Sequence, residues 1–230
     1  MLYNRISNRM AIFESPMECK TTATTTFLPF DRSRLILETD TPEWYKILVI
    51  FQASSETMLF GHPDMNPAWR LFLYGNGSPT HHLGILTGSP TEVDVLGMLS
   101  VGSSHDNAPN EIEAIVPPRC RRQVFLRNTR GERLGYAVSW VNSNDVKAVF
   151  KDTNIPIGKN ILQHKTELFR EMKTVFCGHS KELENAFEAS GPFWGRSYLF
   201  WKGGRPVTFI YEVFSPTLEK YMGQVLHSTT

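Results

Sequence analysis

Glu212 is a carboxylate in a position suited to proton transfer, because the strand expected around it is apolar on both faces. Gly203-Gly204 predicts a tight hairpin loop, since glycine adopts the positive φ that both central positions require. A regular hairpin places Gly195 opposite Glu212, which leaves room for a ligand beside the carboxylate. A buried carboxylate without a cationic partner can donate or share a proton. The alternative is a Glu212 at an edge, hydrogen-bonded to backbone or to an arginine.

Arg122 is the first candidate for binding an anion. It begins an expected strand and shares one face with Val124 and Leu126, because side chains alternate along a strand. A forked guanidinium that points inward from this face could bind a ligand carboxylate. Arg121 points to the opposite face, so at most one of the two arginines is expected to look inward. The alternative is that the basic run of residues 119–122 is a solvated entry to the strand.

Three other groups each allow a chemical and a structural interpretation. The segment Ile155-Pro156-Ile157-Gly158 is a turn whose free backbone N–H groups could bind an anion, or simply a turn. The adjacent pair His81-His82 diverges on a helix and is expected to hold no metal ion. Cys177 is expected to be a half-buried thiol rather than a nucleophile. Neither a metal nor a cofactor is expected.

Composition narrows the class of protein. The chain has 230 residues and a formal net charge of +1, so nucleic-acid binding and attachment to anionic membranes have no electrostatic support. Its apolar stretches, such as residues 47–51 and 207–214, are too short to span a membrane. The 3 cysteines are few and widely spaced, which favours a reducing compartment over a disulfide framework.

Alternating and apolar runs after Pro90 predict an α+β fold, an antiparallel sheet with helices beside it. Helices are expected over residues 68–74 and 181–189, the latter capped by Ser180, and also after the caps Ser78 and Asn144. Residues 1–32 lack periodicity and are expected to form a loosely ordered N-terminal arm on a domain of residues 33–230. The expected strands are 92–101, 122–127, 134–141, 167–176, 192–202 and 205–214.

Several motifs between residues 67 and 220 occur in an informative order. Together they make the sequence similar to chorismate lyases, and most similar to the cyanobacterial and algal-plastid branch of that family. The motifs are Gly75-Asn76-Gly77-Ser78-Pro79-Thr80, Arg121-Arg122-Gln123-Val124-Phe125-Leu126, Ile155-Pro156-Ile157-Gly158, Gly191-Pro192-Phe193-Trp194-Gly195-Arg196, Gly203-Gly204-Arg205-Pro206 and Tyr211-Glu212-Val213-Phe214-Ser215-Pro216.

The resemblance implies a single antiparallel six-stranded sheet with helices on one side and a ligand beneath a helix-turn-helix flap. It assigns Arg122 and the backbone N–H of Ile157 to the ring carboxylate of the substrate, and Glu212 to the neighbourhood of its 4-oxygen. The sequence departs from the bacterial pattern at two positions. Ser139 replaces an arginine, and Pro79, which has no N–H, replaces a backbone donor. Thr80 N–H is the candidate to replace that donor, and Lys159 or Arg196 the candidate for the missing cation.

The activity implied is elimination of pyruvate from chorismate to give 4-hydroxybenzoate for prenylquinone synthesis, with plastoquinone as the expected quinone. Chorismate and 4-hydroxybenzoate are then the only partners, without metal or cofactor, and a monomer is expected. The expected location is the cytoplasm, or the plastid stroma in an alga. The alternative is a non-catalytic domain of the same fold that binds aromatic carboxylates. The ligand-sensing effector domains of some bacterial transcription regulators share this fold. Such regulators need a DNA-binding module, and the first part of the chain contains no convincing helix-turn-helix.

Overall fold

The computed structural model describes residues 43–54, 62, 64–149, 155, 157–165 and 167–226. The chain divides into two units, Met1–Arg34 and Leu35–Thr230. All described residues belong to the second unit. The N-terminal arm expected over residues 1–32 lies outside them.

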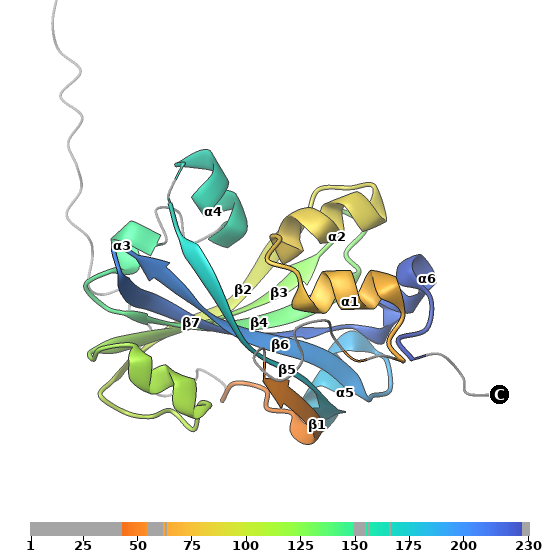
Figure 1. Cartoon of the computed structure of the whole chain (residues 1–230), viewed down its shortest axis with the longest axis horizontal. Coiled ribbons are helices and arrows are strands. Elements are labelled where there is room, and N and C mark those ends of the chain that lie inside the picture. Colours follow the sequence, from red (N-terminus) through yellow and green to blue (C-terminus); the bar gives the residue numbers. More distant parts are fainter. Residues whose placement is uncertain are drawn as a thin grey trace, which may run out of the picture. The chain divides into compact units, whose positions relative to one another are not determined.

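A single antiparallel sheet of seven strands forms the centre of the domain (Figure 1). Six of these strands match the expected ones, and the additional strand is β1, which pairs with β5 at one edge. The expectation of a six-stranded sheet was therefore wrong by this edge strand. In sheet order the strands are β1 (Leu48–Ser54), β5 (Phe169–His179), β6 (Phe193–Lys202), β7 (Arg205–Phe214), β4 (Arg133–Asn142), β3 (Arg119–Arg127) and β2 (Glu92–Gly102).

Three of the helices begin at a side chain that caps them. Asn66 accepts a hydrogen bond from the backbone N–H of Ala68 at 2.9 Å. Ser78 and Ser180 cap α2 and α5 in the same way, as predicted. The helices are α1 (Pro67–Tyr74), α2 (Pro79–Thr87), α3 (Val146–Val149), α4 (Ile157–Gln163), α5 (Lys181–Phe187) and α6 (Glu219–Met222), and the 3-10 turns are η2 (Asn110–Ala114) and η3 (Pro216–Leu218).

Helices cover both faces of the sheet, not one as expected (Figure 1). On one face α1, α2 and α6 pack on the sheet, with Trp69 and Leu83 in the same core cluster as Val124. On the other face η2 and α5 pack on it, with Ile112 and Leu183 in a second cluster. We call these two surfaces the α1/α2 face and the η2/α5 face.

Because both faces of the sheet are covered, the basic run on β3, residues 119–122, has a different environment from the one expected. Arg121 lies on the η2/α5 face, opposite to Arg122 as predicted, and its Nη1 is 2.8 Å from Asp106 Oδ1. Both arginines are almost completely buried, as is Arg119. The interpretation of these residues as a solvated strand entry was wrong, because it assumed that one face of the strand is open to water.

The hairpin between β6 and β7 closes at Gly203 and Gly204, which have φ of 55° and 76°. Trp201 pairs with Pro206, but the next residue along β6, Phe200, pairs with Thr208. Val207 is therefore an extra residue, which makes a β-bulge. Pro206 explains its place, because proline has no N–H for the ladder and is tolerated inside a sheet mainly at bulges.

Candidate functional site

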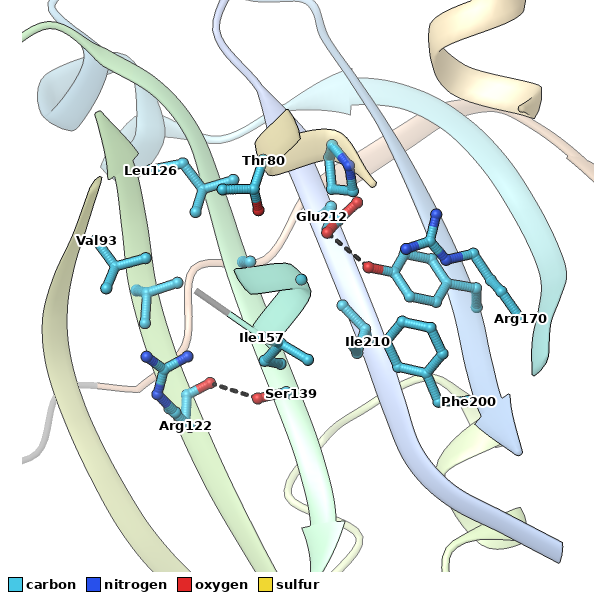
Figure 2. A pocket seen from close by; sticks show the side chains of 15 residues that line it. Thr80, Val93, Arg122, Leu126, Ser139, Ile157, Arg170, Phe200, Ile210 and Glu212 are labelled. Carbon is cyan, nitrogen blue, oxygen red and sulfur yellow. Dashed lines mark hydrogen bonds between the residues drawn. The ribbon is translucent and has the colours of Figure 1, made fainter. Parts of the chain in front are cut away.

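A cavity lies between the α1/α2 face of the sheet and the first turns of α2 and α4 (Figure 2). Its free volume is about 30 Å³, and its lining combines apolar side chains with a few polar ones. The roof is formed by Pro79, Thr80, Ile157 and Gly158. The polar groups of the floor and wall are Arg122, Ser139, Arg170, Tyr198 and Glu212, and the apolar ones are Val93, Val124, Leu126, Ala137, Phe200 and Ile210.

Glu212 is buried in this wall and has two hydrogen-bond donors. Arg196 Nε donates to Oε2 at 3.0 Å, and the hydroxyl of Tyr198 donates to Oε1 at 2.7 Å. The expectation of a carboxylate without a cationic partner was therefore wrong. The bulge at Val207 is the cause, because it shifts the register so that Arg196, rather than Gly195, lies opposite Glu212. A carboxylate held in this way is a hydrogen-bond acceptor.

Arg196 also ties this pair to the roof of the cavity. Its Nη1 donates to the backbone carbonyls of Phe72 at 2.7 Å and Gly75 at 3.1 Å, at the C-terminal end of α1. The last carbonyls of a helix have no partners within the helix, so a buried guanidinium there satisfies them. Glu212 is thereby linked to the loop that leads into α2.

Gly195 is not part of the cavity. It pairs with Val213, and a Cβ atom added to it would collide with the Phe176 ring and with the backbone oxygen of Glu212. Phe176 stacks on Tyr211, with ring centroids 4.5 Å apart, on the η2/α5 face. The glycine therefore makes room for an aromatic ring in the core, and not for a ligand as expected.

Arg122 occupies the expected position in the floor. It shares its face with Val124 and Leu126, and 2% of it is exposed. Its Nη2 donates to the backbone carbonyl of Ile155 at 3.3 Å, just before α4 begins. Ser139 is its neighbour on β4, so no second arginine stands at that position.

The roof brings Thr80 and Ile157 together, as the sequence motifs suggested. Ile157 is the first residue of α4, so the expected turn continues into a helix. Gly158 permits close packing of α4 on α2, because a Cβ atom there would collide with the Ser78 hydroxyl. The backbone carbonyl of Thr80 accepts a hydrogen bond from Thr91 Oγ1 at 2.9 Å. Of the five predicted site residues, Glu212, Arg122, Ile157 and Thr80 meet at one cavity.

Tyr198 and Arg170 line the cavity but were not predicted. Burial, and then the charge of Glu212, raise the pKa of Tyr198 far above its usual range, so its hydroxyl remains a donor. Alternation along β6 could have found Tyr198, because it shares a face with Arg196 and Phe200. Arg170 comes from β5, and its position depends on a pairing that no local pattern indicates.

The remaining candidates lie elsewhere. Lys159 is exposed and borders an open pocket beside His81, not the cavity. Burial raises the pKa of the Cys177 thiol to about 11, as suits a core thiol. Within the described part of the chain there is no cluster of His, Cys, Asp or Glu that could hold a metal ion. Nor does it contain a helix that is long and apolar enough to cross a membrane.

Comparisons with known protein sequences show the family of this chain. A family model described as chorismate pyruvate-lyase Rv2949c-like matches residues 73–222. The uncharacterized protein ycf21 of Pyropia yezoensis is 35% identical over 163 residues, which cover 71% of this chain and 89% of that protein. The ycf21 protein of Cyanophora paradoxa is 32% identical over 151 residues, 66% of this chain and 78% of that protein. Among solved structures, the effector domain of PhnF from Mycobacterium smegmatis is similar with a TM-score of 0.47 at 10% identity, covering 63% of this chain and 92% of that one. The chain belongs to the Rv2949c-like chorismate pyruvate-lyase family.

Proposed function

We propose that the protein is a chorismate lyase, which eliminates pyruvate from chorismate and leaves 4-hydroxybenzoate. The observation that carries the proposal is one cavity that contains both Arg122 and Glu212, in a chain of this family. An arginine can bind the ring carboxylate of chorismate, and a buried carboxylate can take part in the transfer of the proton that the ring loses.

The chemistry asks little of the protein beyond placement. The ring loses one proton, the ether C–O bond breaks, and the enolpyruvate that leaves takes up one proton to become pyruvate. Atoms and electrons balance without an oxidant or a reductant. Because the ring becomes aromatic, the reaction runs downhill, so orientation and charge stabilisation are sufficient contributions.

Each cavity residue then has a role in the proposal. Arg122 and the backbone N–H of Ile157 hold the ring carboxylate, while Thr80 closes the roof. Glu212 is the proton-transfer partner near the 4-oxygen. Of the two roles expected for Glu212, proton donor or proton-transfer partner, the ion pair with Arg196 favours a partner that accepts the proton. Tyr198 and Arg196 hold its two oxygens in place.

The size of the cavity implies movement during the reaction. A free volume of about 30 Å³ has room for about two water molecules, far less than a six-membered ring with substituents needs. The roof from α2 and α4 must therefore open for the substrate and close over it. Release of an aromatic product from such a closed site is expected to be slow relative to the chemistry.

The decisive experiment mixes purified protein with chorismate, without metal or cofactor, and follows 4-hydroxybenzoate and pyruvate together. Equal amounts of the two products are expected. A protein that binds 4-hydroxybenzoate but forms neither product would refute the lyase and would support the non-catalytic binding domain instead.

The setting of the reaction is part of the same proposal. We propose that 4-hydroxybenzoate feeds plastoquinone synthesis, in the cytoplasm or in the plastid stroma of an alga. The protein acts as a monomer, with residues 33–230 as the lyase domain and residues 1–32 as an arm. Isotope-labelled 4-hydroxybenzoate that failed to enter plastoquinone in the source organism would contradict the pathway, but not the lyase.

A further inference from the structure

Arg170 is a second cation in the wall of the cavity, at the end away from Arg122 (Figure 2). Figure 2 shows Glu212, Ile157 and Ile210 between the two arginines. The lining of this one cavity therefore places two guanidinium groups apart from each other, with the Glu212 carboxylate in the same lining. A ligand with a negative group at each end fits this arrangement of charge.

The guanidinium of Arg170 is held firmly. It lies over the ring of Tyr198 at 4.5 Å and over the ring of Phe200 at 5.1 Å. Its Nη1 donates to the backbone carbonyls of Asn76, at 2.9 Å, and Gly77. A cation fixed by two aromatic rings and two carbonyls has little rotational freedom left to lose when it binds an anion.

Part of this guanidinium is still available. The Nε atom of Arg170 is buried and has no hydrogen-bond partner among the residues that the structure describes. Arg170 also forms no ion pair within the part of the chain that the structure describes, whereas Arg196 is neutralised by Glu212. A buried N–H without a partner is unfavourable, and an anion in the cavity would satisfy it.

We propose that Arg170 binds the second carboxylate of the substrate, the one on the enolpyruvyl group. The inference rests on the proposed function, because chorismate is a dianion with a carboxylate on the ring and another on the ether substituent. Arg122 takes the first and Arg170 the second, so that Glu212 lies between them where the ether bond breaks. Arg170 is thus a residue that determines specificity for a dicarboxylate.

The two other candidates for this role are less suitable. Lys159 is exposed and does not line the cavity. Arg196 already donates to Glu212 and to the carbonyls of α1, so it has no spare donor directed at a ligand carboxylate. Arg170 is the described cation that remains beside Arg122 in the lining.

The test compares a dicarboxylate with a monocarboxylate in the same variant. Arg170→Gln should raise the KM for chorismate about 10- to 100-fold while kcat changes less than about threefold. The Kd of 4-hydroxybenzoate, which lacks the second carboxylate, should change less than about twofold in calorimetry. Arg170→Lys keeps the charge without the fork and should recover part of the loss.

Arg133 provides a matched control on the η2/α5 face. It lies 4.5 Å over the Phe125 ring and donates to the carbonyl of Ala186, so Arg133→Gln removes the same kinds of contact away from the cavity. This variant should change neither constant. If Arg170→Gln weakened both ligands by the same factor, Arg170 would merely support the roof and the inference would be overturned. An unchanged KM would overturn it as well.

Failure of the proposed function would look different. A wild-type protein that released neither product would refute the lyase itself. The Kd of chorismate could then be measured without turnover, and the ratio of the two ligands would test Arg170 in the same way.

Discussion

Each face of the sheet has a buried arginine that pairs with a carboxylate, and the two pairs differ in their surroundings. On the η2/α5 face Asp106 Oδ1 pairs with Arg121 at 2.8 Å, and Oδ2 accepts from the Trp140 indole at 2.7 Å. On the α1/α2 face Glu212 pairs with Arg196 at 3.0 Å and accepts from Tyr198 at 2.7 Å. In each pair one arginine and one aromatic side chain donate hydrogen bonds to the carboxylate, at similar distances.

The difference lies in what surrounds each pair. Trp44 packs edge-on against Trp140 at 5.3 Å and donates to the backbone carbonyl of Asp106, so rings fill the space. Beside Glu212 a cavity remains, and Arg122 and Arg170 border it. A buried ion pair is therefore not by itself the mark of a site, whereas free space next to further cations is.

Removing the charge from each carboxylate is the strongest test of this comparison. Glu212→Gln should reduce kcat/KM for chorismate about 100-fold or more, because the proton-transfer group is lost. Asp106→Asn should leave kcat/KM within about threefold and reduce the free energy of unfolding by about 1–3 kcal/mol. Steady-state kinetics and urea unfolding of both variants check this. Equal losses of activity would show that the two faces do not differ as described.

The neighbouring arginines on β3 permit a second comparison. Arg122→Gln should raise the Kd of 4-hydroxybenzoate about 10- to 100-fold, because the ring carboxylate loses its fork. Arg121→Gln should leave this Kd almost unchanged and lower the Tm, because it leaves the partly buried Asp106 without its cationic partner. Calorimetric titration and thermal unfolding distinguish the two. If Arg121→Gln weakened the ligand more, the assignment of the faces to packing and binding would be reversed.

Gly195 tests whether space beside Glu212 serves a ligand or the core. Gly195→Ala should reduce the free energy of unfolding by about 2–3 kcal/mol, since the new methyl group would collide with the Phe176 ring and with the backbone oxygen of Glu212. The KM of the folded variant should not change. Gly84→Ala in α2, where the nearest atom is 3.3 Å away, is the control and should cost much less. A raised KM with unchanged stability would return Gly195 to the site.

Ionisation of Cys177 should have the smallest effect, and it tests whether the α1/α2 face excludes water away from the cavity. Burial raises the pKa of its thiol from 9.0 to about 11. The unfolded chain therefore releases this proton first, and the stability contributed by the neutral thiol is complete below pH 9 and is lost as the pH rises to 11. At pH 10 the loss is about 1 kcal/mol. Cys177→Ala should flatten this part of the pH dependence in urea unfolding, and an unchanged slope would contradict the assignment.

Much of the local structure was predictable, because short-range chemistry decides it. The hairpin at Gly203-Gly204, the caps Ser78 and Ser180, and the face of Arg122 all follow from turn geometry, capping and alternation. The motifs also predicted the family correctly. These features depend on residues that are close along the chain.

The errors arose where partners are distant or where one residue changes the register. β1 was missed because its partner β5 lies far along the chain and its own residues 48–50 are exposed. The ion pair of Glu212 was missed because a regular hairpin was assumed, although Pro206 could have signalled the bulge. Arg170 reaches the cavity only through the pairing of β5 with β6.

The bulge at Val207 absorbs one residue of β7, so the length of the strand beyond it decides which residue of β6 lies opposite Glu212. Because side chains alternate, deleting Phe209 would pair Glu212 with Ser197 and turn it toward the side on which Tyr211 and Phe176 now pack. The carboxylate would leave the cavity and Arg196 would lose its counter-ion, although no residue that lines the cavity is replaced. Deleting Val207 itself would keep Arg196 opposite Glu212. Among relatives, an odd change in length between Thr208 and Glu212 would therefore separate chains that keep the fold from chains that keep the site.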